Sequence, residues 1–156
     1  MTPQKLLTII VLVAILGFGY YSMTAAPVLS DHDYTYQGGI EWHEDPDEAM
    51  ALAEEEEKPV LVYYWTTWCT YCQDYENDHY RDDAVQSELD EYVLLAVNLD
   101  NPGPGSELVS DHGASYPPQH VIMTHDGETI SELGGYVEKD RFLNELESGH
   151  TTETDQ

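Results

Sequence analysis

The chain contains two cysteines, Cys69 and Cys72, and two residues separate them. At the start of a helix, such a pair is suited to disulfide exchange. Backbone N–H groups and the positive end of the helix dipole stabilise the thiolate of the first cysteine. The second sulfur lies one turn further on, close enough to close a disulfide with the first. The pair therefore points to thiol–disulfide chemistry.

Two other uses of a cysteine pair fit the sequence less well. A structural bridge usually closes a longer loop, and a four-ligand zinc site would need two more good ligands. The seven histidines are scattered and form no second paired motif. We therefore expect neither a metal site nor a cofactor. A metal carrier that uses Cys69, Cys72 and a histidine such as His120 is an alternative.

The residues around the cysteines predict the elements that position them. The apolar and aromatic run Val60–Trp65 is typical of a buried strand, and a short polar turn follows it. Residues 70–78 then predict a helix that begins at the cysteines. Before the strand, Asp45 followed by Pro46 predicts the start of a helix over residues 47–57.

The rest of the sequence continues this alternation. It predicts a helix over 83–90, a strand over 92–99, a short helix over 107–112, a hairpin of strands over 120–124 and 128–133, and a terminal helix over 137–146. Helices that alternate with buried strands and end in a hairpin require a mixed sheet with helices on both faces. The fold class is therefore α/β.

The N-terminal segment predicts export. Residues 6–23 carry no charge, and their length and composition suit a transmembrane helix. Lys5 precedes them and acidic residues follow, so the positive-inside rule places the rest of the chain on the extracytoplasmic side of the cell membrane. Residues 24–26 also resemble a signal-peptide cleavage site, and cleavage would give a secreted domain. We expect a signal anchor over 1–24, a linker over 25–39, a globular domain over 40–146 and a disordered acidic tail over 147–156.

The charge of the chain restricts its partners. Its formal net charge is −26 at pH 7, and all 31 acidic residues lie from Asp31 onward. Nucleic acid and anionic lipid headgroups would be repelled by such a surface. Concentrated salt screens the self-repulsion, since the Debye length falls to about 3 Å at 1 M. We therefore expect a halophilic protein that does not bind nucleic acid.

The motif Trp68-Cys-Thr-Tyr-Cys72 after a strand resembles the thioredoxin superfamily. The resemblance covers about residues 40–146, and it includes a proline before the third strand and a hairpin turn at Asp126-Gly127. The segment Lys58-Pro-Val-Leu-Val62 is similar to exported thioredoxin-like domains, including the C-terminal domain of DsbD-type thiol reductases. The resemblance implies a thioredoxin-like fold and an extracytoplasmic thiol–disulfide oxidoreductase. Such an enzyme would act on protein thiols and disulfides. The predicted membrane anchor also suggests a membrane protein as its redox partner.

The resemblance also implies roles for individual residues. Cys69 would be the attacking thiolate, at the exposed helix start, and Cys72 the more buried resolving thiol that forms a disulfide with it. Trp68 would shield the site, and Thr70 and Tyr71 between the cysteines would tune the redox potential.

A loop proline of the family is cis, lies against the disulfide and exposes backbone with which a substrate peptide pairs. The family shares a spacing of nine residues between this proline and the glycine of the hairpin turn. Counting back nine residues from Gly127 therefore gives Pro118 for this role. The residue before the cis proline normally offers a backbone N–H to substrate, but Pro117 has none. Either that hydrogen bond is lost, or Pro117 is the cis residue and Tyr116 supplies the pairing.

A second departure from the family pattern concerns proton transfer. The family often has a buried aspartate six residues before the first cysteine, and here that residue is Tyr63. We therefore expect the second thiol to lose its proton by another route, through water or a tyrosine hydroxyl. A redox-inert binding module tethered to the membrane, with Trp68 and Tyr71 as contacts, is the alternative function.

Overall fold

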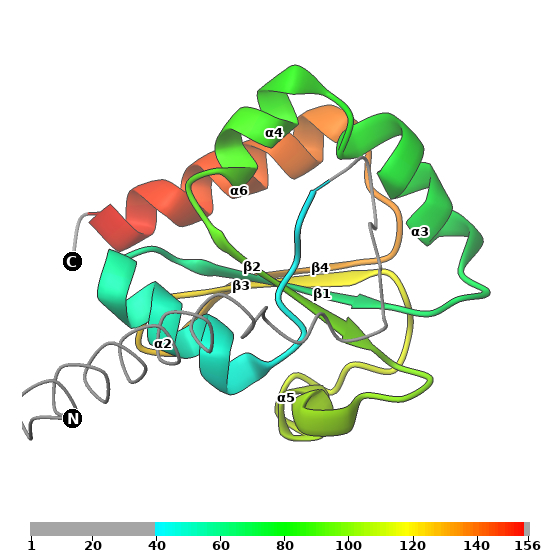
Figure 1. The fold of residues 1–156 in the computed structure, drawn as a ribbon. Helices are drawn as coiled ribbons and strands as arrows, with labels where there is room; N and C mark the ends of the chain where they lie inside the picture. Colours follow the sequence, from blue (N-terminus) through cyan, green and yellow to red (C-terminus); the bar gives the residue numbers. More distant parts are fainter. Residues whose placement is uncertain (1–39, 155–156) are drawn as a thin grey trace, which may run out of the picture. The chain divides into compact units, whose positions relative to one another are not determined.

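A four-stranded mixed sheet forms the centre of residues 40–154, the part of the chain that the computed structural model describes (Figure 1). The strand order is β2-β1-β3-β4. β1 is parallel to β2, whereas β3 is antiparallel to both β1 and β4. The strands are β1 (Val60–Trp65), β2 (Val93–Asn98), β3 (Gln119–Met123) and β4 (Thr129–Gly134).

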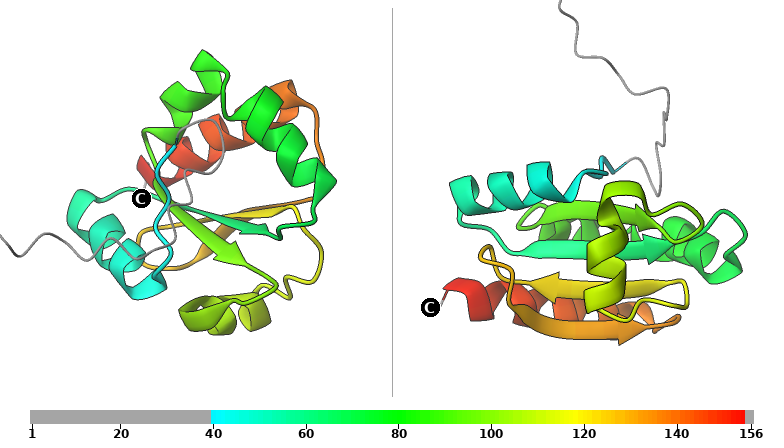
Figure 2. Two further views of the ribbon diagram at one scale, coloured as in Figure 1. Left: turned by 45° about the vertical axis from the view of Figure 1, so that its right-hand side comes forward. Right: turned by 90° about the horizontal axis from the view of Figure 1, so that it is seen from below.

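Helices cover both faces of the sheet, as Figures 1 and 2 show. One face carries α2 (Pro46–Glu56) and α5 (Ser106–Asp111), and a 3-10 turn at Gly103–Gly105 precedes α5. The other face carries α3 (Thr70–Asp74), α4 (Asp83–Leu89) and α6 (Lys139–Thr154). A π-helical turn, Tyr75–His79, continues α3. The predicted order of elements and the mixed sheet flanked by helices are confirmed.

Strand β1 divides the core into two layers because its side chains alternate between the two faces of the sheet. Leu61, Tyr63 and Trp65 pack on the side of α3, α4 and α6. Val60, Val62 and Tyr64 pack on the side of α2 and α5. All six side chains are buried, which explains why the strand is a continuous apolar and aromatic run.

The start of α2 follows the local signal in the sequence. The Asp45 side chain caps the helix by accepting hydrogen bonds from the N–H groups of Asp47 and Glu48, at 2.9 and 3.3 Å. Pro46 is the first helical residue, where its missing N–H costs nothing. The helix therefore begins within one residue of the predicted position.

The prediction of a disordered tail is wrong for residues 147–154, because α6 continues to Thr154. The tail looks polar, but it packs on the sheet through a residue without a side chain: Gly149 is buried against Tyr92 and Ile122. The hydroxyls of Ser148 and Thr151 also donate to backbone carbonyls four residues earlier.

The predicted membrane anchor over 6–23 and the linker over 25–39 lie outside the described residues. Within residues 40–154, no helix has the length and apolarity needed to cross a bilayer.

We expect Gly149→Ala to destabilise the fold. A Cβ atom at this position would lie 2.6 Å from Tyr92 Oη and 2.8 Å from Ile122 Cγ2. Alanine favours helices over glycine by about 1 kcal/mol, but overpacking of this kind costs about 1–3 kcal/mol. Urea unfolding at constant salt should therefore show a lower free energy of unfolding. Ser148→Ala, at the exposed neighbouring position, should change it by less than about 0.5 kcal/mol. An unchanged or increased stability of Gly149→Ala would contradict this account of the packing.

Candidate active site

The two cysteines form a disulfide at the start of α3. Their sulfurs are 2.04 Å apart, and Cys69 is the N-cap residue of the helix. The Cys72 N–H points at Cys69 Sγ over a nitrogen–sulfur distance of 3.1 Å. A thiolate at Cys69 would therefore meet a backbone donor and the positive end of the helix dipole. The local geometry agrees with the chemistry predicted for this pair.

Both sulfur-bearing residues are nearly covered in this disulfide state. Cys69 is 5% exposed and Cys72 is 1% exposed. The order of exposure matches the predicted roles, and Cys69 itself is nearly covered in the oxidised protein although its neighbours at the helix start are exposed. The reason is that Cys69 packs in the same apolar cluster as Trp65 and Tyr75. The neighbouring Thr70 is exposed.

Strand register brings four segments to the edge of the sheet where β1 ends. The last residue of β1, Trp65, is paired with Asn98 of β2, and its neighbour Tyr64 is paired with Gln119 at the start of β3. Gln119 is also paired with Gly134 at the end of β4. The cysteines, the residues after β2, the loop before β3 and the loop after β4 therefore meet at one edge.

Asp100, which the sequence reasoning did not identify, holds the residues before the cysteines. Its carboxylate accepts a hydrogen bond of 2.9 Å from the indole Nε1–H of Trp68. It also accepts two of 3.3 Å, from the backbone N–H and the hydroxyl of Thr67. A signal was present, because residues that follow adjacent parallel strands lie at the same sheet edge.

The loop before β3 contains the cis proline, and it is Pro118. The alternative in which Pro117 is cis is therefore wrong. Pro118 is buried, and its carbonyl accepts a hydrogen bond of 2.7 Å from the Gly135 N–H in the loop after β4. Pro117 occupies the position before the cis bond, and it has no N–H to offer.

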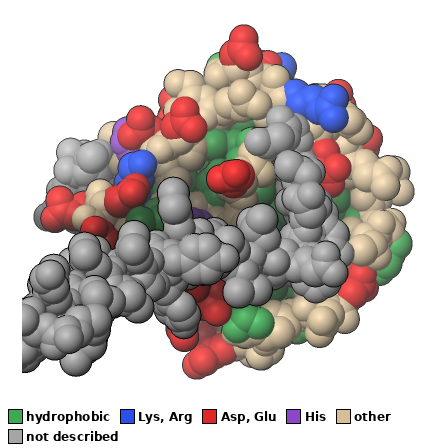
Figure 3. Space-filling model, in the orientation of Figure 1, with side chains coloured by type: hydrophobic (Ala, Val, Ile, Leu, Met, Phe, Trp, Pro, Cys, Tyr) green, Lys and Arg blue, Asp and Glu red, His purple; other side chains and the backbone are tan. Residues whose placement is uncertain are grey.

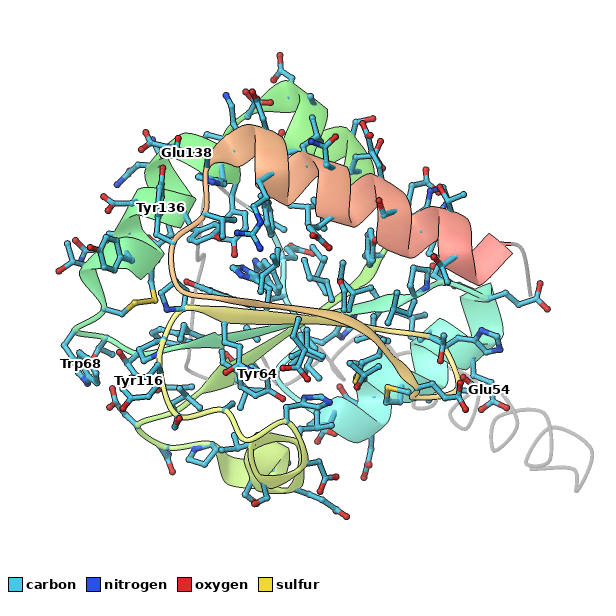
Figure 4. All side chains as sticks on the ribbon, turned by 180° about the vertical axis from the view of Figure 1, so that it is seen from behind. Glu54, Tyr64, Trp68, Tyr116, Tyr136 and Glu138 are labelled. Carbon is cyan, nitrogen blue, oxygen red and sulfur yellow. A yellow bond between two sulfur atoms is a disulfide. The ribbon has the colours of Figure 1, made fainter. Side chains whose placement is uncertain are left out.

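Four aromatic side chains, which we call the aromatic rim, lie around this edge: Trp68, Tyr71, Tyr116 and Tyr136. Three of them are strongly exposed, with Trp68 at 68%, Tyr71 at 58% and Tyr116 at 79%. Tyr136 is half-buried, and its ring centre lies 5.9 Å from that of Tyr71. In Figure 4, Trp68, Tyr116 and Tyr136 lie on the side of the molecule that carries the disulfide.

Tyr63, at the position where the family often has an aspartate, is an aromatic core residue. Its side chain is fully buried, and its hydroxyl has no hydrogen-bond partner. Burial raises its pKa far above the ordinary value of a tyrosine, because a phenolate would lose its solvation. Tyr63 therefore stays protonated and does not replace the carboxylate as a base.

The ring of Tyr63 stacks on His120, its register partner in β3, with ring centres 4.8 Å apart and planes 15° apart. His120 Nε2 is hydrogen-bonded to the Tyr80 hydroxyl at 2.6 Å. Burial, with a smaller effect of His79, lowers the pKa of His120 to about 3, so the imidazole is neutral near pH 7. The tyrosine–histidine contact that replaces the acid is therefore uncharged.

Tyr75 connects this buried cluster to the helix that carries Cys72. Its backbone N–H donates to the Cys72 carbonyl, and its ring centre lies 4.7 Å from that of His120. His79 also packs on Tyr75, with ring centres 4.4 Å apart, and its Nε2 is hydrogen-bonded to the Val137 carbonyl. In the part of the chain that the structure describes, no three His, Cys, Asp or Glu side chains are grouped to hold a metal ion.

The chain matches a known protein family and several proteins of known name. Residues 46–150, from α2 to within α6, match the thioredoxin-like domain family. The chain is 24% identical over 148 residues to the thiol:disulfide interchange protein DsbD of Photorhabdus laumondii, covering 92% of this chain. It is 26% identical over 107 residues to the protein of the same name from Vibrio vulnificus. The aligned parts span only 25% and 18% of those relatives.

Solved structures agree with this fold. The solution structure of a thioredoxin from Thermus thermophilus matches with a TM-score of 0.62 and 29% identity, over 70% of this chain and 85% of that one. The reduced C-terminal domain of DsbD from Neisseria meningitidis matches with a TM-score of 0.58 and 22% identity, over 66% of this chain and 92% of that one. At 22% identity, the similarity to the DsbD domain shows a shared fold alone.

We expect Asp100→Ala to release Trp68, because it removes the acceptor of the indole N–H and of both Thr67 donors. Acrylamide should quench the tryptophan fluorescence of this variant more strongly than that of the wild type. The free energy of unfolding should fall by about 1 kcal/mol. Asp100→Asn is the matched control, since its amide oxygen still accepts from the indole. If quenching is the same in Asp100→Ala and the wild type, the hydrogen bond does not hold the ring.

Protonation of His120 should destabilise the fold in acid. Its pKa is about 3 in the folded protein and about 6.5 when unfolded, so the unfolded chain binds more protons between these values. The stabilisation is complete above about pH 6.5 and is lost as pH falls toward about 3, by at most about 1.4 kcal/mol per pH unit. Urea unfolding should give a shallower pH dependence for His120→Leu. Parallel pH profiles for the two proteins would refute the assignment to His120, since the other ionisable groups are common to both.

Proposed function

This chain belongs to the thioredoxin-like domain family. We propose that it is a thiol–disulfide oxidoreductase that exchanges disulfides with exported proteins outside the cytoplasm. The observation that carries this proposal is the Cys69–Cys72 disulfide at the N-cap of α3. Relatives named thiol:disulfide interchange proteins support it.

In the reductive direction, the thiolate of Cys69 attacks a disulfide of the substrate and forms a mixed disulfide. One substrate sulfur leaves as a thiolate and takes a proton from solvent. The thiolate of Cys72 then attacks Cys69 Sγ, the mixed disulfide breaks, and the second substrate thiol is released. The substrate gains two electrons, and the enzyme pair becomes a disulfide that a dithiol donor must reduce again. In the oxidising direction every step is reversed.

The buried surroundings of Cys72 limit the ways in which its thiol can lose a proton during this cycle. Cys72 is almost completely covered, and the residue at the usual aspartate position, Tyr63, stays protonated. The adjacent His120 is neutral near pH 7. The Cys72 proton therefore has to leave without a carboxylate at that position.

The location is part of the proposal. The uncharged residues 6–23 would anchor the protein in the cell membrane by a single span, with the catalytic domain on the extracytoplasmic side and a membrane protein as redox partner. Cleavage of that segment would instead release a secreted form. Acidic side chains are spread over the face seen in Figure 3, and few basic ones interrupt them. Such a surface suits a protein that works in concentrated salt.

The activity can be measured as the reduction of insulin disulfides by the purified protein in molar salt with a dithiol donor. We expect turnover by the wild type and none by Cys69→Ser, since the attacking sulfur is missing. Cys72→Ser should accumulate a mixed disulfide with substrate, because the resolving sulfur is missing. If the wild type shows neither turnover nor reversible oxidation of its cysteines, the enzymatic function is wrong, and a binding module is favoured. The midpoint potential, compared with about −270 mV for thioredoxin and about −120 mV for a strong oxidant, gives the direction of electron flow.

A further inference from the structure

The aromatic rim is unusual among the exposed residues of this protein. Within residues 40–154, the large hydrophobic side chains that are strongly exposed are Trp68, Tyr71 and Tyr116, and all three lie within three residues of Cys69 or of the cis proline Pro118. Exposing such rings in water is unfavourable, and an exposed aromatic group that surrounds a reactive site is typical of a docking surface.

Two parts of the rim are held in place before any partner arrives. Asp100 fixes the indole of Trp68, and the Gly135 N–H ties the loop that carries Tyr136 to the Pro118 carbonyl. The hydroxyl of Tyr75 also contacts that loop, because it lies 3.4 Å from the Gly135 carbonyl oxygen. Fixed rings lose little conformational entropy when a partner binds.

A peptide that docks at this edge can form fewer backbone hydrogen bonds than a strand that is added to an ordinary sheet edge. Pro117 stands before the cis bond and lacks the N–H that a partner's carbonyl would accept. A docked segment therefore depends more on side-chain contacts with the rings.

The negative charge near the rim favours a basic side chain on a docked partner. Besides burial, the carboxylates of Glu138, Asp78 and Asp74 raise the pKa of Tyr136, so this part of the rim lies in a negative potential. Glu138 lies next to Tyr136 in Figure 4. The basic residue beside them, Lys139, forms an ion pair with Asp82. A cation over these rings would meet both ring faces and carboxylates, whereas a second copy of this acidic chain would be repelled.

We propose that the aromatic rim binds a protein segment that carries an arginine or lysine next to its reactive cysteine. The inference rests on the proposed disulfide exchange and specifies its substrate class. The basic side chain stacks on the rim by cation–π contact, with Glu138, Asp74 and Asp78 balancing its charge. Because this contact is short-range, it persists in molar salt, where the attraction between distant charges is screened.

The test uses reduced protein and three disulfide-linked peptide dimers that differ only in the residue beside cysteine, which is arginine, glutamine or glutamate. Rates are measured in dilute buffer and in 1 M NaCl and are divided by the rate with hydroxyethyl disulfide, which has no peptide to dock. At 1 M NaCl we expect the arginine peptide to react at least about threefold faster than the glutamine peptide, and the glutamate peptide to react most slowly.

Three variants separate contact from net charge. Tyr71→Leu removes the ring that packs on Tyr136 beside the carboxylates near the rim, and this variant should lose most of the arginine preference. Glu138→Gln and Glu54→Gln each remove one negative charge, the first beside the rim and the second on the opposite side of the molecule in Figure 4. Glu138→Gln should reduce the preference, and Glu54→Gln should leave it as in the wild type.

The outcomes distinguish the two proposals. Equal rates for the three peptides at 1 M NaCl, with hydroxyethyl disulfide still reduced, would overturn the rim assignment and leave disulfide exchange intact. A preference that Tyr71→Leu leaves unchanged would also overturn it. If no disulfide is reduced at all, the proposed function fails. Tryptophan fluorescence titrations with cysteine-free peptides, serine replacing cysteine, then report arginine binding at the rim independently, and absence of a preference there overturns the rim assignment as well.

Discussion

The site depends on the way β1 is held between two neighbours of opposite direction. β1 runs parallel to β2 and antiparallel to β3, and its residues are buried on both faces. The end of β1, the end of β2 and the start of β3 therefore meet at one edge of the sheet. That edge collects Cys69, Asp100 and Pro118, which lie far apart in the sequence. Hydrogen bonds between the strands set their relative positions before any side chain of the site contributes.

The core behind the disulfide uses aromatic packing where a charged group would otherwise have to be buried. A buried carboxylate needs strong partners to stay ionised, because removal from water disfavours its charge. Here Tyr63 stacks on His120, and Tyr80 satisfies one nitrogen of the imidazole. The cluster avoids the cost of a buried charge, but it leaves the Tyr63 hydroxyl and His120 Nδ1 without protein partners. Its stability is therefore sensitive to protonation of the imidazole.

The surface combines two properties that act over different distances. A net charge of −26 acts over long distances in dilute buffer and is screened in concentrated salt. The exposed rings at the disulfide edge act only on contact, so salt weakens them little. A protein with this surface has to recognise its partners mainly through contact when salt is high, which gives the rim its importance.

The cysteine pair, the strand–turn–helix that carries it and the order of the elements could all be predicted from local patterns. Hydrophobic periodicity and helix caps such as Asp45-Pro46 act between near neighbours in the chain. The resemblance to the thioredoxin superfamily, through its spacing from Gly127, also indicated Pro118 as the cis residue, but the structure was needed to exclude Pro117. Three contacts could be found only in the folded chain: Asp100 holds Trp68, His120 stacks on Tyr63, and Gly149 lets α6 continue along the sheet. These contacts join residues that are 27 or more positions apart, and they arise from strand register and close packing, which a local pattern does not encode.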